Sequence, residues 1–242
     1  MLEQKYAFTL GEALLAMATL GVVAALTIIV LSQDTQGKET ILKVKKAYSV
    51  MSNAYENAST KYGEIAEWDD ISSAAFGNNI GNSMNLSTNC GTASNLPKYN
   101  DCVPDCPKIY KAGGGSLDTC TSSDVAKMIT TDGFSYAFQI ESKTCDIDVT
   151  KGSENAPLIL KRVCGTAMTD IYNSRKGKNK NLYGVDLFLF YITKDGIIPV
   201  GLDSDKTYEY KEGECARKIT TDAFGCTAKL IYDKKVIEEK TK

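Results

Sequence analysis

The chain has 242 residues, of which 43% are hydrophobic and 24% are charged, and this apolar share argues against disorder throughout. The formal net charge is −2, which argues against a generally basic nucleic-acid-binding protein. The sequence contains no histidine, and this removes Ser-His-Asp and Cys-His catalysis, histidine general bases and histidine-ligated zinc. The catalytic groups that most often identify an enzyme are therefore missing, and no catalytic residues are predicted.

The first predicted element is an apolar run over residues 8–31. Its 24 residues are long enough to cross a bilayer as a helix. The run is too long for a secretory signal peptide, and the small residue beside it, Ala7, precedes it instead of following it. Its single charged residue, Glu12, is costly in hydrocarbon and needs a partner, but the run contains no Lys or Arg. The partner must therefore come from another chain or from a new amino terminus close by.

These residues carry a family resemblance. Ala7-Phe8-Thr9-Leu10-Gly11-Glu12 resembles the class III signal of type IV pilins and type II secretion pseudopilins. In that family a small residue precedes Phe-Thr-Leu-x-Glu, and about twenty apolar residues follow. Gly21 matches a frequent family glycine inside the helix. Two positions depart from the pattern, since Ala7 stands where glycine is commoner and Ile29 stands where many relatives carry proline.

The resemblance implies a history of processing and assembly. A prepilin peptidase would remove the leader, residues 1–7, and would methylate the new amino group of Phe8. The subunit would then pass from the inner membrane into a helical filament of other copies or related pilin-like subunits. There Glu12 would pair with the amino terminus of Phe8 on a neighbouring subunit, so that two costly buried charges neutralise each other.

Residues 32–62 are predicted to form the amphipathic half of the same helix. Apolar residues recur at steps of three and four from Ile41 to Tyr62, which is typical of a helix with one buried face. We expect this face to pack on the protein's own sheet. Other positions carry a lysine cluster of Lys38, Lys43, Lys45 and Lys46. The cluster is interpreted as a solvated helix face, and the alternative is a contact with lipid headgroups before assembly.

Residues 63–125 are rich in Gly, Asn, Ser and Thr and show no clear periodicity, which predicts a long loop region. Four of the eight cysteines fall here: Cys90, Cys102, Cys106 and Cys120. Their spacing lacks the paired Cys-x-x-Cys knuckles of zinc sites. We predict that they pair among themselves in two disulfides, because irregular chain with little core needs covalent support.

Residues 126–242 are predicted to form an antiparallel sheet. Phe134–Ile140 nearly alternates apolar and polar residues, and Val185–Ile192 is strongly strand-like. An Asp-Gly turn then leads into residues 197–200, which predicts a hairpin. The sequence near the carboxyl end suggests one more hairpin, formed by residues 228–232 and 236–237.

The predicted fold class is therefore α+β. A long N-terminal helix, transmembrane in its first half and amphipathic in its second, would pack on a C-terminal antiparallel sheet as in a pilin. Residues 184–188, 194–199 and 225–231 also resemble a C-terminal region found in many uncharacterised prepilin-type proteins. This second resemblance points to a pilin-like subunit without naming the machine that it serves.

Two further disulfides are predicted, Cys145–Cys164 and Cys215–Cys226, because these cysteines are close in the chain and short closures cost little chain entropy. The even number of loop-flanked cysteines favours an oxidising compartment outside the cytoplasm. A bridge between Cys215 and Cys226 would hold the C-terminal strands against the sheet after export.

Three aspartates, Asp146, Asp148 and Asp186, raise the question of calcium, which prefers carboxylate and carbonyl ligands. No EF-hand loop follows them. The default interpretation is a solvated acidic turn, so no cofactor or metal is expected, and a Ca²⁺ site is the alternative.

The function that these features favour is a structural subunit of a type IV pilus-like or type II secretion-like filament, without catalytic activity. The alternative is a minor tip subunit that binds DNA, a surface or a secreted protein, which the large loop region and eight cysteines would suit. A major subunit is expected to bind no nucleic acid. The expected location is the inner membrane, with one span and the head outside the cytoplasm, and then the filament.

Overall fold

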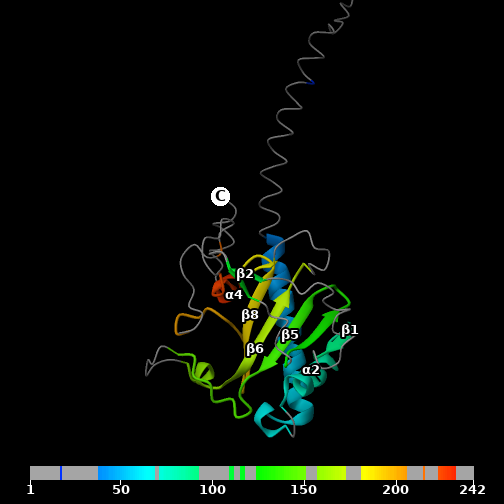
Figure 1. Cartoon of the computed structure of the whole chain (residues 1–242), viewed down its shortest axis with the longest axis vertical. Coiled ribbons are helices and arrows are strands. Elements are labelled where there is room, and N and C mark those ends of the chain that lie inside the picture. The colour runs from blue at the N-terminus through cyan, green and yellow to red at the C-terminus, as the bar shows by residue number, and fades with distance from the viewer. Residues whose placement is uncertain are drawn as a thin grey trace, which may run out of the picture.

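The computed structural model describes residues 17, 38–68, 71–92, 109–111, 115–117, 124–150, 157–172, 181–205, 215 and 223–232. In this part of the chain, helix α1 (residues 38–62) packs against a six-stranded antiparallel sheet (Figure 1). The α+β architecture predicted from the sequence is confirmed to that extent. The predicted leader and, apart from Met17, the apolar run over 8–31 lie outside the described residues. Among the residues that the structure describes, no helix has the length and apolar character that a membrane span requires.

Helix α1 has one buried face, as its three- and four-residue periodicity predicts. That face combines long side chains with alanines, which allow a close approach to the sheet. Its almost fully buried members are Ile41, Val44, Ala47, Met51, Ala54, Tyr55 and Ala58. Gly63 ends the helix, with a φ of +83° and an amide that donates to the carbonyl of Ser59 (2.9 Å). Glycine adopts this left-handed conformation without steric cost and so closes the last turn.

Part of the region over 63–125, predicted to be a loop, is regular. Three elements follow α1: the 3-10 helix η1 (Ile65–Glu67), the helix α2 (Ser73–Gly81) and the strand β1 (Leu86–Gly91). α2 begins at a cap, since the hydroxyl of Ser72 accepts a hydrogen bond from the amide of Ala75 (3.3 Å). It buries Phe76 and Ile80, one turn apart. The glycine- and asparagine-rich composition around this short apolar pair obscured the helix in the sequence.

The main sheet has the strand order β1-β4-β5-β6-β8-β9, and every neighbouring pair is antiparallel. The strands after β1 are β4 (Ala126–Thr130), β5 (Ser135–Ile140), β6 (Val163–Asp170), β8 (Leu187–Thr193) and β9 (Gly196–Pro199). The strands predicted at 134–140, 185–192 and 197–200 therefore correspond to β5, β8 and β9. The predicted Asp-Gly turn joins β8 to β9, where Thr193 pairs with Gly196.

Strand β8 lies at the centre of the packing, and all of its residues are buried. On the α1 side, Phe190 and Ile192 join the buried face of α1 in one core cluster, and the ring of Tyr48 stacks on Phe190 with 5.8 Å between centroids. On the far side, Leu189 and Tyr191 belong to a second apolar cluster. Because both faces of β8 are covered, its sequence is an almost continuous apolar run instead of an alternating one.

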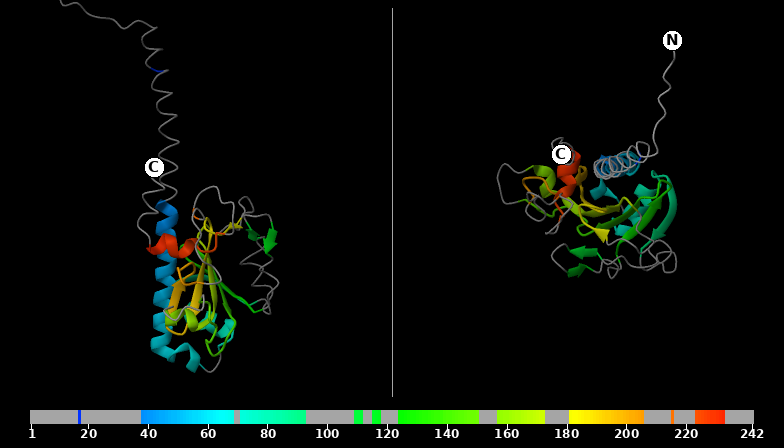
Figure 2. Two further views of the ribbon diagram at one scale, coloured as in Figure 1. Left: turned by 90° about the vertical axis from the view of Figure 1, so that its left-hand side faces the viewer. Right: turned by 90° about the horizontal axis from the view of Figure 1, so that it is seen from above.

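Three short strands form a second sheet on the far side of the main one. They are β2 (Ile109–Lys111), β3 (Gly115–Leu117) and β7 (Asn181–Leu182). The strand order is β3-β2-β7, with β2 and β7 parallel. Both views in Figure 2 show α1 on one face of the main sheet and the small strands β2 and β3 on the other. The predicted loop region therefore contributes β2 and β3 as well as α2 and β1.

The hairpin predicted near the carboxyl end is wrong. Residues 228–232 belong to helix α4 (Cys226–Tyr232), and the predicted return strand over 236–237 lies outside the described residues. A five-residue apolar run fits a helix or a strand equally well by periodicity. Tertiary contacts decide the outcome, because a disulfide from Cys215 to Cys226 and a hydrogen bond from the amide of Leu189 to the hydroxyl of Thr227 hold the segment across the edge of β8.

Candidate functional site

The residues predicted to act in processing and assembly, Ala7, Phe8, Glu12 and Gly21, lie outside the described residues. The structure describes the part of the helix that follows them, together with the head that this helix carries. The candidate functional site is therefore α1 itself. Its inner face is bound to the sheet, and its outer face points away from the sheet.

The first half of α1 is held on the head by aromatic and charged side chains. Tyr172, which follows β6, shares a hydrogen bond with the hydroxyl of Thr40 (3.0 Å), and its ring centroid lies 4.0 Å from the Nζ of Lys43. Nearly one turn further on, Lys46 forms an ion pair with Asp132 in the turn between β4 and β5 (2.9 Å). Two members of the predicted lysine cluster thus bind the head and do not simply form a solvated face.

Asp132 is ionised more easily than an ordinary aspartate. Burial raises its pKa, but hydrogen bonds from the hydroxyl of Thr130, from Lys46 and from the amide of Phe134, with the charge of Lys46, outweigh burial and hold the pKa below its usual value. The charged carboxylate is therefore the favoured partner for Lys46 at neutral pH.

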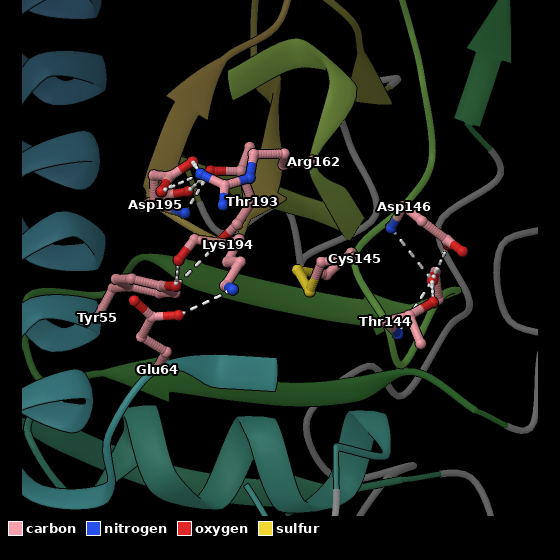
Figure 3. The surroundings of a disulfide bond; sticks show 12 residues. Tyr55, Glu64, Thr144, Cys145, Asp146, Arg162, Thr193, Lys194 and Asp195 are labelled. Atoms are coloured by element: carbon pink, nitrogen blue, oxygen red, sulfur yellow. Dashed lines mark hydrogen bonds and ion pairs between the residues drawn. A yellow bond between two sulfur atoms is a disulfide. The ribbon is translucent and has the colours of Figure 1, made fainter. Parts of the chain in front are cut away.

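The second half of α1 is anchored on the turn between β8 and β9 (Figure 3). The hydroxyl of Tyr55 lies 2.9 Å from the carbonyl oxygens of both Thr193 and Lys194 and donates to them. Burial raises the pKa of Tyr55 to about 12, so that the hydroxyl keeps its proton. The ammonium of Lys194 pairs with Glu64, just after α1 (2.9 Å), and this hydrogen bond lowers the pKa of the Glu64 carboxyl.

The same turn is also tied to the start of β6. One guanidinium nitrogen of Arg162 donates to both carboxylate oxygens of Asp195, at 2.9 and 3.0 Å. The amide of Lys194 donates to the carbonyl of Arg162 (2.9 Å). Because the side chains of this ion pair are 35% and 43% exposed, it adds little stability by itself. Its contribution is geometric, since it joins β6 to the turn that receives Tyr55.

Both disulfides predicted from proximity in the chain are present in the structure. Cys145–Cys164 joins the segment after β5 to β6, close to the contacts of Tyr55 in Figure 3. Cys215–Cys226 joins the chain before α4 to the first residue of α4. Cys90 is disulfide-bonded as well. Its three predicted partners lie outside the described residues and are Cys102, Cys106 and Cys120.

Helix α4 covers the part of β8 that β9 does not reach. β9 pairs with β8 only from Phe190 onward. The amide of Leu189 is satisfied by the hydroxyl of Thr227, at 3.1 Å. This approach requires glycine, because a Cβ on Gly201, whose φ is +100°, would lie 2.1 Å from the carbonyl oxygen of Gly225. The close backbone contact, together with the disulfide, fixes the start of α4 on the sheet.

The outer face of α1 consists of side chains opposite the buried ones. They are Lys38, Leu42, Lys45, Ser49, Asn53, Glu56 and Thr60. Leu42 is 68% exposed, although it is a large apolar residue. The face is basic in its first half and acidic at Glu56. Within the described part of the chain, neither Lys45 nor Glu56 has an ion-pair partner.

The three aspartates considered as calcium ligands are not gathered into a metal site. Asp146 accepts a hydrogen bond from the hydroxyl of Ser142 (2.6 Å), which lowers its pKa, and Asp148 accepts one from the amide of Thr150 (2.8 Å). Both are exposed and cap local turns, whereas Asp186 is buried between β7 and β8. The described residues contain no group of three or more His, Cys, Asp or Glu side chains that could hold a metal ion.

No known protein family, curated protein or solved structure matches this chain. Sequence reasoning missed the anchoring roles of Tyr55, Asp132 and Tyr172. For Tyr55 the sequence showed the apolar stripe of the helix, but not the carbonyl groups of Thr193 and Lys194 that receive its hydroxyl. For Asp132 the local Asp-Gly turn was the available signal.

Proposed function

We propose that this chain is a structural subunit of a type IV pilus-like or type II secretion pseudopilus-like filament. The observation that carries the proposal is the motif from Ala7 to Glu12, in which a single carboxylate enters an otherwise apolar run. Prepilin peptidase would cut before Phe8 and methylate its amine, and Glu12 would pair with the amine of a neighbouring copy. The chain would thus be a substrate of the peptidase and a building block, with no catalytic activity of its own.

The way in which α1 carries the head supports this role. The helix is held along its inner face by a continuous apolar stripe, and polar contacts at Lys46 and Tyr55 add anchors in each half. A load applied along the helix would therefore pass to the sheet through many contacts. Disulfides suit a head that works outside the cytoplasm, where no cytoplasmic reductant can open them.

Mass spectrometry of sheared surface filaments from cells that make this protein tests the proposal. The mature chain should begin at Phe8 with a methylated amine and should carry oxidised cysteines. An intact Met1 terminus in assembled material would contradict the processing step. The abundance of the chain also discriminates, because a major subunit dominates the filament, whereas a minor tip subunit is present in trace amounts.

A matched pair of variants tests the role of Glu12. Glu12→Leu should insert into the membrane at least as well as the wild type, because it removes a costly charge, but it should not enter filaments. Ala13→Leu changes the neighbouring position without removing a charge and should assemble normally. Efficient assembly of Glu12→Leu would show that the carboxylate does not pair with the neighbouring amine.

A further inference from the structure

We propose that a surface formed by α2 and β1 binds a neutral polysaccharide. We call this surface the amide row, and it consists of Asn78 on α2, Asn82 just after α2, Asn89 on β1 and Tyr62 at the end of α1. Figure 1 shows α2 beside β1, which is an edge strand of the main sheet. The inference goes beyond the proposed function, because neither cleavage by a peptidase nor assembly of a filament requires a carbohydrate ligand.

The members of the amide row are neighbours in space. The side-chain nitrogen of Asn89 donates to the side-chain oxygen of Asn78 (3.2 Å). The backbone amide of Asn82 donates to the backbone carbonyl of Asn78 (3.1 Å), so these two asparagines lie one helical turn apart. The side chain of Asn82 is hydrogen-bonded in turn to the hydroxyl of Tyr62. Because the three asparagines are exposed and Tyr62 is half-buried, the row can be reached from solvent along its length.

The surface that carries the amide row is uncharged. Residues 71–92, which include α2 and β1, contain no Asp, Glu, Lys or Arg, although 24% of the residues in the whole chain are charged. Lys127, on the neighbouring strand β4, is only 7% exposed. Lys61 contacts the row at its far end, through the hydroxyl of Tyr62. A partner therefore forms no ion pair with α2 or β1, which argues against nucleic acids and acidic polysaccharides as ligands.

The asparagine side chains have hydrogen-bonding capacity to spare. A side-chain amide has two donor hydrogens and an oxygen that accepts two hydrogen bonds. Asn89 uses one hydrogen on Asn78, and its oxygen accepts a bond from the backbone amide of Gly91 (3.0 Å). These bonds hold the Asn89 amide in one orientation, so that less freedom is lost when a ligand binds. The remaining neutral donors and acceptors match sugar hydroxyls, because each hydroxyl both donates and accepts.

An extended polypeptide added to the edge of the sheet at β1 is the other candidate partner. Such a partner needs a regular row of main-chain groups. The pairing of β1 with β4 is irregular at two places, between residues 86 and 88 and between residues 89 and 91. Irregularities of this kind protect a sheet edge against strand pairing. Three consecutive residues of β1, Ser87, Thr88 and Asn89, are exposed, so this edge offers polar side chains to a ligand.

Binding of the full-length, detergent-solubilised chain to immobilised polysaccharides tests the inference. The probes are the neutral polymers cellulose, chitin, mannan and dextran and the acidic polymers alginate and hyaluronate. The expected result is saturable binding to at least one neutral polymer and to neither acidic one. Because no ion pair with α2 or β1 contributes, the dissociation constant should change by less than about twofold when the salt concentration is raised about tenfold.

Matched substitutions of asparagine locate the binding surface. Asn78→Ala and Asn82→Ala each remove an amide from the row and should each weaken binding about tenfold, which corresponds to the loss of one or two hydrogen bonds. Asn82→Ala keeps the bond between Asn89 and Asn78, so it tests the row without disturbing that contact. Asn53→Ala removes an exposed asparagine from the outer face of α1 and should leave binding unchanged. Circular dichroism of each variant would confirm that the head is folded.

The remaining outcomes would overturn the inference. These are failure of the folded wild type to bind every neutral polymer, binding confined to the acidic polymers, and equal losses in Asn82→Ala and Asn53→Ala. Self-association of the wild type that Asn78→Ala and Asn82→Ala both abolish would assign the amide row to a second copy of the chain instead. Since the assay uses the solubilised chain, its result does not depend on whether the chain enters filaments, and the proposed function can fail separately.

Discussion

The two faces of α1 differ in how many of their side chains are buried or bound to another residue of the head. On the inner face, apolar residues are buried against the sheet, and Tyr55 places its hydroxyl on two carbonyl oxygens. On the outer face, Leu42 is largely exposed, and Lys45 and Glu56 have no ion-pair partner among the described residues. The inner face accounts for the stability of one head. The exposed side chains of the outer face add little to that stability, so substitutions on the two faces should have separable effects.

The largest loss of stability is expected from a substitution in the core that the inner face of α1 covers. Phe190→Ala removes a fully buried ring that stacks on Tyr48 and should lower the free energy of unfolding by about 3–5 kcal/mol. Leu42→Ala, on the outer face, should change it by less than about 0.5 kcal/mol. Guanidinium unfolding of the detergent-solubilised chain measures both. A similar loss in the two variants would show that the faces are not separable.

Removal of the Cys145–Cys164 disulfide, which joins the segment after β5 to β6, should cause the next largest loss of stability. The Cys145–Cys164 bridge closes a sequence separation of 19 residues, and replacing both cysteines by serine should cost about 3 kcal/mol. The free energy of unfolding should be measured for the variant and the wild type with and without a reductant. With the reductant the wild type also loses this bridge, so the difference in stability between the two should disappear. A variant as stable as the oxidised wild type would exclude a stabilising role for this bond.

Tyr55→Phe tests the polar part of the inner face. It deletes a buried hydroxyl and leaves the carbonyl oxygens of Thr193 and Lys194 without that donor, which should cost about 1–3 kcal/mol. Tyr172→Phe is a matched control, because its hydroxyl makes an exposed hydrogen bond, and it should cost less than about 0.5 kcal/mol. Equal losses in thermal unfolding would mean that burial of the Tyr55 hydroxyl contributes nothing.

The smallest expected effect is on the stability of the head at acid pH, and it comes from Asp132. The pKa of Asp132 is lowered in the folded head, so its contribution to stability is present above its ordinary pKa of 3.8 and is lost as the pH falls through the lower, folded value. Asp132→Asn should therefore flatten the acid side of the stability curve, with little further change between pH 5 and pH 8. Unfolding midpoints of the variant and the wild type, measured from pH 2 to pH 7, check this difference. Parallel curves would contradict it.

The sequence predicted the parts of the fold whose signals are local. The stripe from Ile41 to Ala58 repeats at helical steps, and β8 and β9 flank an Asp-Gly turn, so neither assignment needs distant contacts. α4 could not be predicted in this way, since its start is fixed by a bond to Leu189, 38 residues earlier. Likewise, the apolar stripe includes Tyr55, but the carbonyl groups that receive its hydroxyl lie 138 and 139 residues away.

The cover that α4 gives to β8 has a consequence for the order in which the chain is made. Leu189 precedes Thr227 by 38 residues, and synthesis at about 5–20 residues per second separates them by roughly 2–8 s. During that interval β8 and β9 have been made, while the helix that covers the edge of β8 at Leu189, beyond the reach of β9, has not. An open strand edge of this kind can pair with another chain. The last part of the described chain to be synthesised thus ends the period in which nascent heads are open to pairing with one another.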